Sequence, residues 1–178
     1  DAGHVRIYEY SNSSWTQLGS DIDGEAANDR SSYSVSMNSA GDRVAIGARR
    51  NDGTASDAGH VRIYEYSNSS WTQLGSDIDG EAANDFYGNS VSMNSAGDRV
   101  AIGAANNDGT GSNAGHVRIY EYSNSSWTQL GSDIDGEAAS DFSGTSVSMN
   151  SAGDRVAIGA TDNDGTASDA GHVRIYEY

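Results

Sequence analysis

The sequence predicts an all-β protein built from β-propeller-type blades, each of four antiparallel strands. First, the segment DAGHVRIYEY begins at residues 1, 57 and 169, and with Asn in place of Asp at residue 113, so the chain repeats with a constant step of 56 residues. Second, short segments rich in β-branched and aromatic residues alternate with clusters of Gly, Ser, Asn and Asp, which is typical of strands joined by turns. Third, no stretch shows a sustained helical period. Repeats of about this length indicate a propeller or an array, and four antiparallel strands form one propeller blade.

The repeat makes the chain one continuous repeat domain. Its parts are residues 1–56, 57–112 and 113–168, followed by residues 169–178 as the first strand of a fourth repeat. Propellers have about four to eight blades, so three repeats and a fraction are too few to close a ring alone. We therefore expect the ring to close only by assembly, or the chain to form part of a longer array, because open strand edges favour pairing with another copy.

Two strands open each repeat, as the second copy illustrates. His60–Tyr66 (HVRIYEY) is rich in β-branched and aromatic residues, and the polar turn SNSS follows it. Trp71–Ile78 (WTQLGSDI) then runs into the acidic loop DGEAAND. Two strands joined by a short turn predict a β-hairpin.

Two more strands complete the repeat. In Asn89–Met93 (NSVSM) the apolar residues alternate with serines, which indicates one buried face. After the turn NSAGD, Arg99–Ala104 (RVAIGA) is a nearly continuous apolar run, which indicates a strand covered on both sides. Because the most apolar strands should lie deepest, we expect NSVSM to be innermost, followed by RVAIGA, HVRIYEY and finally WTQLG.

Charge and composition exclude several classes of partner. The formal net charge is −16, and all ten basic residues are arginines. An acidic surface repels phosphate groups, so nucleic acid and anionic lipid are poor partners, whereas divalent cations and cationic surfaces suit it. No window approaches the ~18 apolar residues of a membrane span, so membrane insertion is not expected. The absence of cysteine excludes disulfides, thiolate metal sites and cysteine nucleophiles.

The run FYGNSVSMNSAGDRVAIGA in the second repeat carries a family resemblance. With Phe86 and Gly88 before one strand and Gly103-Ala104 at the end of the next, it resembles the FG-GAP repeat of integrin-α-like β-propellers. Phe142 and Gly144 match the motif in the third repeat. The chain is thus similar to an FG-GAP repeat protein with recently amplified, near-identical repeats.

This resemblance carries expectations about fold, location and cation binding. It implies a propeller at an extracellular or cell-surface location. It also implies a calcium loop between the first two strands, which here is the short segment Asn94–Asp98. The first repeat departs from the motif, because Arg30-Ser31-Ser32 replaces its Phe and Gly.

The acidic loop DIDGEAAND predicts a cation site in each repeat. Carboxylates two residues apart around a glycine could wrap a hard cation such as calcium, which takes six to eight oxygen ligands. The predicted ligands are Asp21, Asp23, Glu25 and Asp29, with Asp77, Asp79, Glu81 and Asp85, and with Asp133, Asp135, Glu137 and Asp141, in the three repeats. The open alternative is a solvated acidic turn with capping-type hydrogen bonds. Calcium is the single cofactor that the sequence suggests.

Three residue types recur in every repeat and are expected to be structural. The histidines that open HVRIYEY should contact a neighbouring backbone group or carboxylate, and zinc is not expected because no second histidine lies nearby in sequence. The tryptophans should pack between blades or against the outer strand, with a carbohydrate-stacking platform as the alternative. The arginines after NSAGD could pair with acidic residues of an adjacent blade. These residues are His4, His60, His116 and His172, then Trp15, Trp71 and Trp127, then Arg43, Arg99 and Arg155.

Two further features lie on expected surface turns. One is the N-glycosylation acceptor pattern Asn-Ser-Ser, which begins at Asn12, Asn68 and Asn124. The other is a variable loop face, where the repeats differ from one another, at Arg30, Tyr33, Arg49, Arg50, Phe86, Tyr87 and Phe142. Such variation indicates either a binding face or drift in solvent-exposed loops, and both interpretations stay open.

These observations favour a function without catalysis. No G-x-S-x-G, H-E-x-x-H or P-loop occurs, so an enzyme is not expected. We expect an extracellular structural or adhesive protein that self-assembles through its repeats, with another copy, neighbouring repeats, or an extracellular protein or glycan as partner. The alternative is a calcium-dependent, ligand-binding propeller that resembles the integrin head. A hydrolase or lyase propeller would need residues unique to one blade.

Overall fold

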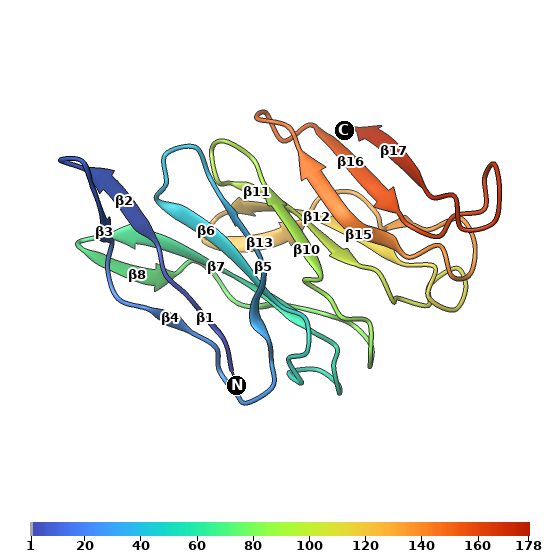
Figure 1. Ribbon diagram of the computed structural model, residues 1–178, viewed down its shortest axis with the longest axis horizontal. Helices are drawn as coiled ribbons and strands as arrows, with labels where there is room; N and C mark the ends of the chain where they lie inside the picture. Colours follow the sequence, from blue (N-terminus) through green and yellow to red (C-terminus); the bar gives the residue numbers. More distant parts are fainter. Residues whose placement is uncertain (1) are drawn as a thin grey trace.

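Residues 2–178 form an all-β array of blades that lie side by side (Figure 1). The computed structural model describes these residues; Asp1, the first residue of the first repeat, lies outside them. No helix occurs among residues 2–178, and so none of them forms a helix able to span a membrane. The predicted fold class is confirmed, because separate antiparallel sheets succeed one another along the molecule without closing on themselves.

Two complete blades occupy the middle of the array. In each, four strands pair in sequence order and a short fifth strand also pairs with the third. The first complete blade contains β5 (Ser31–Met37), β6 (Arg43–Ala48), β7 (His60–Ser67), β8 (Ser70–Gln73) and β9 (Ile78–Asp79). The second contains β10 (Ser90–Met93), β11 (Arg99–Ala104), β12 (His116–Ser123), β13 (Ser126–Gln129) and β14 (Ile134–Asp135).

Incomplete blades lie at the two ends of the array. The first comprises β1 (His4–Val5), which pairs with β4 (Ile22–Asp23), and β2 (Tyr8–Ser11), which pairs with β3 (Ser14–Gln17). The last comprises β15 (Ser143–Met149), β16 (Arg155–Ala160) and β17 (His172–Glu177). The first end therefore has only the outer strands of a blade, and the last end has only its three inner strands.

The strand order is as predicted, but the outer strand is shorter than predicted. The expected strand Trp71–Ile78 is divided into β8 and β9, and both pair with β7. Gly75 lies between them with a φ of +78°, and this left-handed conformation ends the extended run. The Leu74 N–H still donates to the Ile63 carbonyl, so the gap stays close to β7.

The hydrophobic core lies between the blades. Val100, Ala101 and Ile102 of β11 are fully buried, which confirms a strand covered on both sides. Val91 and Met93 of β10 are also buried, in agreement with the alternation of NSVSM. Each blade therefore provides apolar groups to both of its neighbours.

Two-residue turns close the outer hairpins. Asn12 and Ser13 have φ values of +50° and +64°, and the same pair of positive values recurs in the next two repeats. Two consecutive left-handed residues between paired strands form a type I′ turn, whose twist matches that of a hairpin. Asn12, Asn68 and Asn124 are consequently exposed at hairpin tips.

Adjacent blades approach one another most closely at glycines. A Cβ atom on Gly103 would lie 2.2 Å from the carbonyl oxygen of Gly144 in the next blade. The Ser90 hydroxyl donates to that same oxygen at 2.7 Å. Only a residue without a side chain leaves room for this backbone contact.

Gly103→Ala should therefore loosen the junction between two blades. We expect a loss of about 2 kcal/mol in the free energy of unfolding, because the added methyl group clashes with backbone. The measurement is the urea midpoint of unfolding.

Gly159→Ala provides the matched control, because Gly159 occupies the same place in the last blade. In the monomer, on which the comparison is made, its Cβ would meet the Ser146 hydroxyl at 2.4 Å and no backbone of a following blade. A serine side chain can rotate away, so we expect a loss below about 1 kcal/mol. Equal losses in the two variants would contradict the interpretation.

Candidate functional site at the blade junctions

Each complete junction brings a histidine, an arginine and two carboxylates from adjacent repeats together. At the first junction, His60 and Arg62 lie at the start of β7, and Asp77 lies just before β9. The pairing of β9 with the start of β7 places Asp77 near His60. Glu25 comes from the acidic loop of the preceding repeat. The second junction repeats this arrangement with His116, Arg118, Asp133 and Glu81.

The distances within each triad of histidine and two carboxylates are short but exceed hydrogen-bond length. His60 Nδ1 lies 3.8 Å from Glu25 Oε2 and 3.7 Å from Asp77 Oδ2. His116 Nδ1 lies 3.9 Å from Glu81 Oε1 and 3.9 Å from Asp133 Oδ2. In each triad the ligand atoms all lie within 4.8 Å of one another, so both triads could hold a metal ion.

The arginine of each junction pairs with a carboxylate: Arg118 with both at the second junction, and Arg62 with Glu25 at the first. Arg118 Nε donates to Asp133 Oδ1 at 2.8 Å, and its Nη2 donates both to Asp133 Oδ2 at 2.7 Å and to Glu81 Oε2. The Arg118 hydrogen bonds lower the pKa of Asp133 to about 2. At the first junction Arg62 Nη1 lies 3.2 Å from Glu25 Oε1, while Nη2 donates to the backbone carbonyl of Asp23.

Both histidines are buried and are held in the neutral form. Burial lowers the pKa of His60 and of His116, and the positive charge of the nearby arginine lowers it further. The adjacent carboxylates act in the opposite direction but do not outweigh burial. Neither ring nitrogen of His116 has a hydrogen-bond partner. A neutral imidazole has a lone pair available for a cation.

The two ends of the chain carry incomplete versions of the same cluster. His172 Nδ1 lies 3.7 Å from Glu137 Oε2, and the sequence ends before the aspartate that would follow. His4 is exposed and has no glutamate from a preceding repeat within the described residues, while Arg6 pairs with Asp21 at 2.9 Å. A complete triad thus needs groups from two consecutive repeats.

The predicted ligands within one acidic loop do not share one site. Among residues 2–178, only the two junction triads bring the ligand atoms of three or more histidine or carboxylate side chains within 4.8 Å of one another. From the predicted set they include Glu25, Asp77, Glu81 and Asp133. Asp85 is buried instead, where its Oδ2 accepts from Ala82 N–H and from Asn107 Nδ2 at 2.9 Å. Asp29 and Asp141 are bound in the same way by Asn51 and Asn163, so these loop residues have a capping role.

The remaining predicted ligands fall into two groups. Some lie on short strands, and the others pair with arginines of the two end blades. Asp23, Asp79 and Asp135 lie on β4, β9 and β14, opposite a histidine of the third strand. Asp21 pairs with Arg6, and Glu137 pairs with Arg174. The carboxylates of one loop are thus distributed between two junctions.

The short turn Asn94–Asp98 is closed by its own hydrogen bonds. Asn94 Oδ1 accepts from the backbone N–H groups of Gly97, Asp98 and Arg99 at 3.0, 3.1 and 3.0 Å. Asn94 Nδ2 donates to Asp98 Oδ1 at 2.7 Å. The side chains that a calcium loop would direct at an ion therefore stabilise the turn itself.

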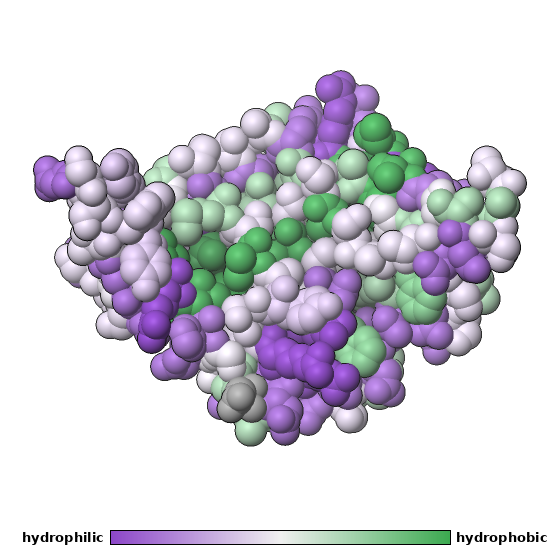
Figure 2. Space-filling view, in the orientation of Figure 1, coloured by the Kyte–Doolittle hydropathy of each residue, from purple (hydrophilic) through white to green (hydrophobic). Residues whose placement is uncertain are grey.

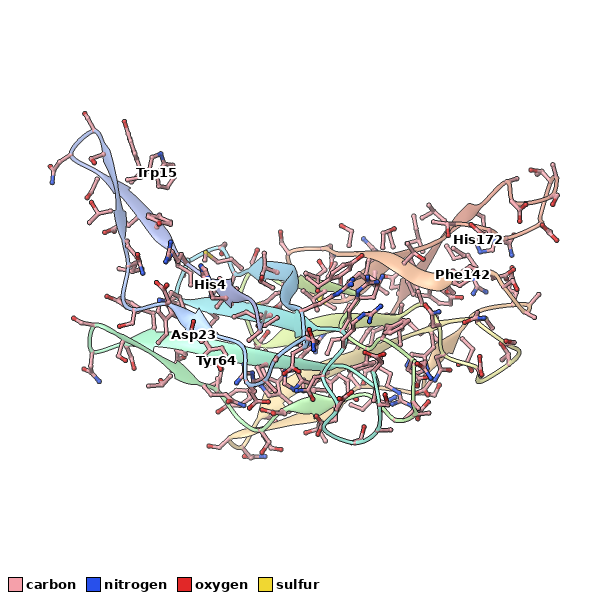
Figure 3. All side chains as sticks on the ribbon, turned by 60° about the horizontal axis from the view of Figure 1, so that its bottom comes forward. His4, Trp15, Asp23, Tyr64, Phe142 and His172 are labelled. Atoms are coloured by element: carbon pink, nitrogen blue, oxygen red, sulfur yellow. The ribbon has the colours of Figure 1, made fainter. Side chains whose placement is uncertain are left out.

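The tryptophans pack between blades, as predicted. Trp71 Nε1 donates to the Leu18 carbonyl of the preceding repeat at 2.8 Å, and Trp127 bonds to Leu74 in the same way. Among residues 2–178 no blade precedes that of Trp15, and Trp15 is 67% exposed. Figure 3 shows it on the β2–β3 hairpin, which projects away from the body of the molecule.

The arginines after NSAGD pair within their own blade, which corrects the sequence prediction. Arg99 Nε and Nη2 donate to Glu121 Oε1 at 3.0 and 2.8 Å, because the register of β11 and β12 places the two residues opposite each other. Its contacts with the next blade are instead from Nη1 to the Gly153 carbonyl at 3.2 Å and from the guanidinium carbon to the ring centre of Tyr178 at 5.7 Å.

The variable loop face is partly buried. The Arg49 guanidinium carbon lies 3.7 Å from the centre of the Tyr33 ring and 5.5 Å from that of Phe86, and the Arg50 carbon lies 5.6 Å from the centre of the Phe86 ring.

Tyr87 of this loop face is only 1% exposed, since it bridges to Gly59 of the neighbouring blade and packs in the core. Tyr87 is thus unavailable for recognition, whereas Arg30 is exposed and Phe142 is half-buried.

Sequence reasoning missed the histidines as members of a cation site. Their carboxylate partners are distant in sequence, and one of them belongs to the preceding repeat. The available signal was the recurrence of one His-Val-Arg and one acidic loop in every repeat. Without the placement of neighbouring blades, that signal could not be assigned to one site.

Comparisons with known proteins support the fold alone. No family model matches the chain, and no curated protein matches its sequence. Among solved structures it is similar to a protein from Bacteroides uniformis provisionally named a 6-phosphogluconolactonase, with a TM-score of 0.65 and 9% sequence identity over 99% of this chain and 44% of that one. It also matches hydrazine synthase from Kuenenia stuttgartiensis, with a TM-score of 0.49 and 12% identity over 89% of this chain and 48% of that one.

The chain spans less than half the length of both matched structures. The first of them has the name of an enzyme, which does not support the prediction that the present chain is not one. At 9% identity the likeness shows a shared fold and carries no information about activity.

The buried histidines should make stability depend on pH in metal-free buffer. Their pKa is lowered in the folded state, whereas an unfolded histidine titrates near about 6.5. Below that pH the unfolded chain binds more protons than the folded chain does. The free energy of unfolding should therefore decrease as the pH is lowered from about 7 to about 5. The measurement is the urea midpoint across this range.

The variant His60→Gln/His116→Gln should lose this part of the pH dependence. Every carboxylate is the same in both proteins, so the comparison isolates the two histidines. His4→Gln is the control, measured on the monomer, where His4 is exposed. Identical pH profiles for the wild type and the double variant would contradict the assignment.

Proposed function

We propose that the chain is a non-enzymatic structural or adhesive repeat protein, extracellular or on the cell surface, that assembles with itself through its blades. The observation that carries this proposal is the complementarity of its two ends. One end has the outer strands of a blade, and the other end has the inner strands.

The N-terminal end presents aromatic groups without a partner. Trp15 and Tyr10 are strongly exposed on the β2–β3 hairpin. Val35 and Met37 of β5 are also exposed, because the preceding blade has no inner strands to cover them. Their counterparts in β10 are buried. This end is therefore suited to packing against further strands.

The C-terminal end presents the matching groove. It is lined by Ile119, Leu130, Ile134, Val156 and Tyr176, between the second complete blade and the last one. Leu130 is the repeat equivalent of Leu18 and Leu74, whose carbonyls bind the tryptophans of the following blade. The empty groove is thus the place that a third tryptophan would occupy.

Apolar groups also remain uncovered along this end. Val173 and Ile175 of β17 are more than half exposed. Figure 2 shows hydrophobic atoms in an oblique band that runs from beside β1 and β5 to beside β16 and β17. An exposed apolar band of this kind is typical of an interaction surface.

A second copy of this chain is the occupant that the sequence favours. Residues 4–10 are identical to residues 172–178, so β1 and β2 of a second copy could pair with β16 in place of β17. Glu9 would then lie opposite Arg155, where Glu177 lies within one chain. The following β3 and β4 would complete the blade, and Trp15 would enter the groove at Leu130.

This exchange would give three complete blades for each copy. Two copies would supply six blades, which is within the range of about four to eight in closed propellers. The FG-GAP resemblance supports the extracellular role, and Asn12, Asn68 and Asn124 stay predicted glycosylation sites. The calcium-dependent, integrin-like alternative has less support, because the carboxylates of one acidic loop are divided between two junctions.

The test is the mass of the chain in solution by light scattering, with Trp15→Ala as the variant. The 178-residue chain of 18.6 kDa should form a particle of a whole-number multiple of that mass, and Trp15→Ala should shift it toward the monomer. Thr16→Ala is the control, since Thr16 is exposed on the same strand. A monomer at every concentration, or equal masses for wild type and Trp15→Ala, would overturn the proposal.

A further inference from the structure

We propose that each complete junction triad binds one first-row transition-metal dication, such as Zn²⁺, through His Nδ1 and one oxygen of each carboxylate. The two sites are Glu25, His60 and Asp77, and Glu81, His116 and Asp133. This proposal goes beyond self-assembly and does not depend on it, because both triads lie within one chain.

The buried histidine is the first argument. The His116 side chain is 1% exposed, and neither of its ring nitrogens has a hydrogen-bond partner. Buried polar groups without a partner are rare and destabilising. Its Nδ1 is the atom that faces Glu81 and Asp133. A bound cation would supply the partner that the protein does not.

The spacing of the ligand atoms is the second argument. The four nitrogen–oxygen distances across the two triads are 3.7 to 3.9 Å, beyond hydrogen-bond length. Two ligands at about 2.1 Å from one ion lie roughly 3.4 Å apart at a tetrahedral angle and about 4.2 Å apart when opposite. The observed nitrogen–oxygen distances exceed the tetrahedral value by about 0.3 to 0.5 Å, so an ion requires the side chains to close by that amount.

The donor set indicates the class of metal. One imidazole nitrogen with two carboxylate oxygens is a mixed set that suits zinc and its neighbours. Calcium takes six to eight oxygen ligands, which three side chains with a nitrogen among them do not provide. Three protein ligands would leave a fourth position for water.

The arginine contacts leave room for the ion. Arg118 binds Glu81 through Oε2, whereas Oε1, which also accepts from Asn107 Nδ2, faces the histidine. Asp133 Oδ2 accepts from Arg118 and has a second lone pair. At the first junction Asp77 Oδ1 accepts from Gln73, and Asp77 Oδ2 faces His60. The arginine thus orients ligating carboxylates, as outer-shell groups of metal sites do.

The experiment is calorimetric titration of chelator-treated Trp15→Ala protein, which the proposed assembly leaves as a monomer, with zinc chloride. We expect about two zinc ions per chain, one for each complete triad. His60→Gln and His116→Gln should each remove one ion, and the double variant should remove both. His4→Gln is the matched control, because it changes the same sequence motif where the monomer has no complete triad, and in the monomer it should retain two ions.

A second set of measurements separates loss of ligand from loss of fold. Glu25→Gln/Glu81→Gln should also abolish zinc binding, and circular dichroism should show that the variant stays folded. Cobalt(II) in place of zinc should give visible absorption bands that the double histidine variant lacks. The wild type should bind two zinc ions per chain as a monomer and a third where copies assemble, because Glu137 would then meet His4 and Asp21 of the second copy.

Three outcomes would overturn the proposal. They are no heat with zinc, zinc binding of unchanged stoichiometry in the folded double histidine variant, and calcium binding to these triads in preference to zinc. The first two would identify the triads as salt-bridge clusters with the arginine as their only cation. The third would show that the proposed class of metal is wrong.

Discussion

The close contact between the backbones of adjacent blades is the constraint on which the rest of the structure depends. Gly103 and Gly144 meet without an intervening side chain, and Gly47 and Gly88 do the same at the preceding junction. This spacing brings an indole within hydrogen-bonding distance of the preceding repeat. It also brings a glutamate of one repeat to the histidine of the next. A wider spacing would separate the groups of every junction.

Much of the architecture could be predicted from one repeat, because strand periodicity and turn chemistry are local. The alternation in NSVSM and the apolar run RVAIGA correctly indicated which strands are covered on one or both sides. The interruption of Trp71–Ile78 was missed, because its cause is the left-handed conformation of Gly75. The burial of Tyr87 was missed for a related reason, since the adjacent blade covers it.

The candidate site was harder to predict than the fold. The acidic loop correctly indicated a charged region at the junction. Which of its carboxylates lie together, however, depends on contacts between residues that are far apart in the sequence. Asp85 faces inward to bind Asn107, while Glu81 of the same loop faces His116 across the junction. Only the packing of two blades determines which oxygen of each loop faces which histidine. A repeat protein can thus form one site from halves that look like separate motifs.

Under the proposed assembly, residues 4–10 of one copy would compete with the identical residues 172–178 of another for the edge of β16. Strand β17 belongs to the same chain as β16, so it binds β16 with a high effective concentration. The concentration of free copies must exceed that value before residues 4–10 of a second copy displace β17. The incoming segment has an advantage, because it also brings β3, β4 and a tryptophan. Assembly would therefore be slow to begin, since β17 must first leave its edge, and persistent once formed. A monomer could act as a store that joins only when copies are abundant.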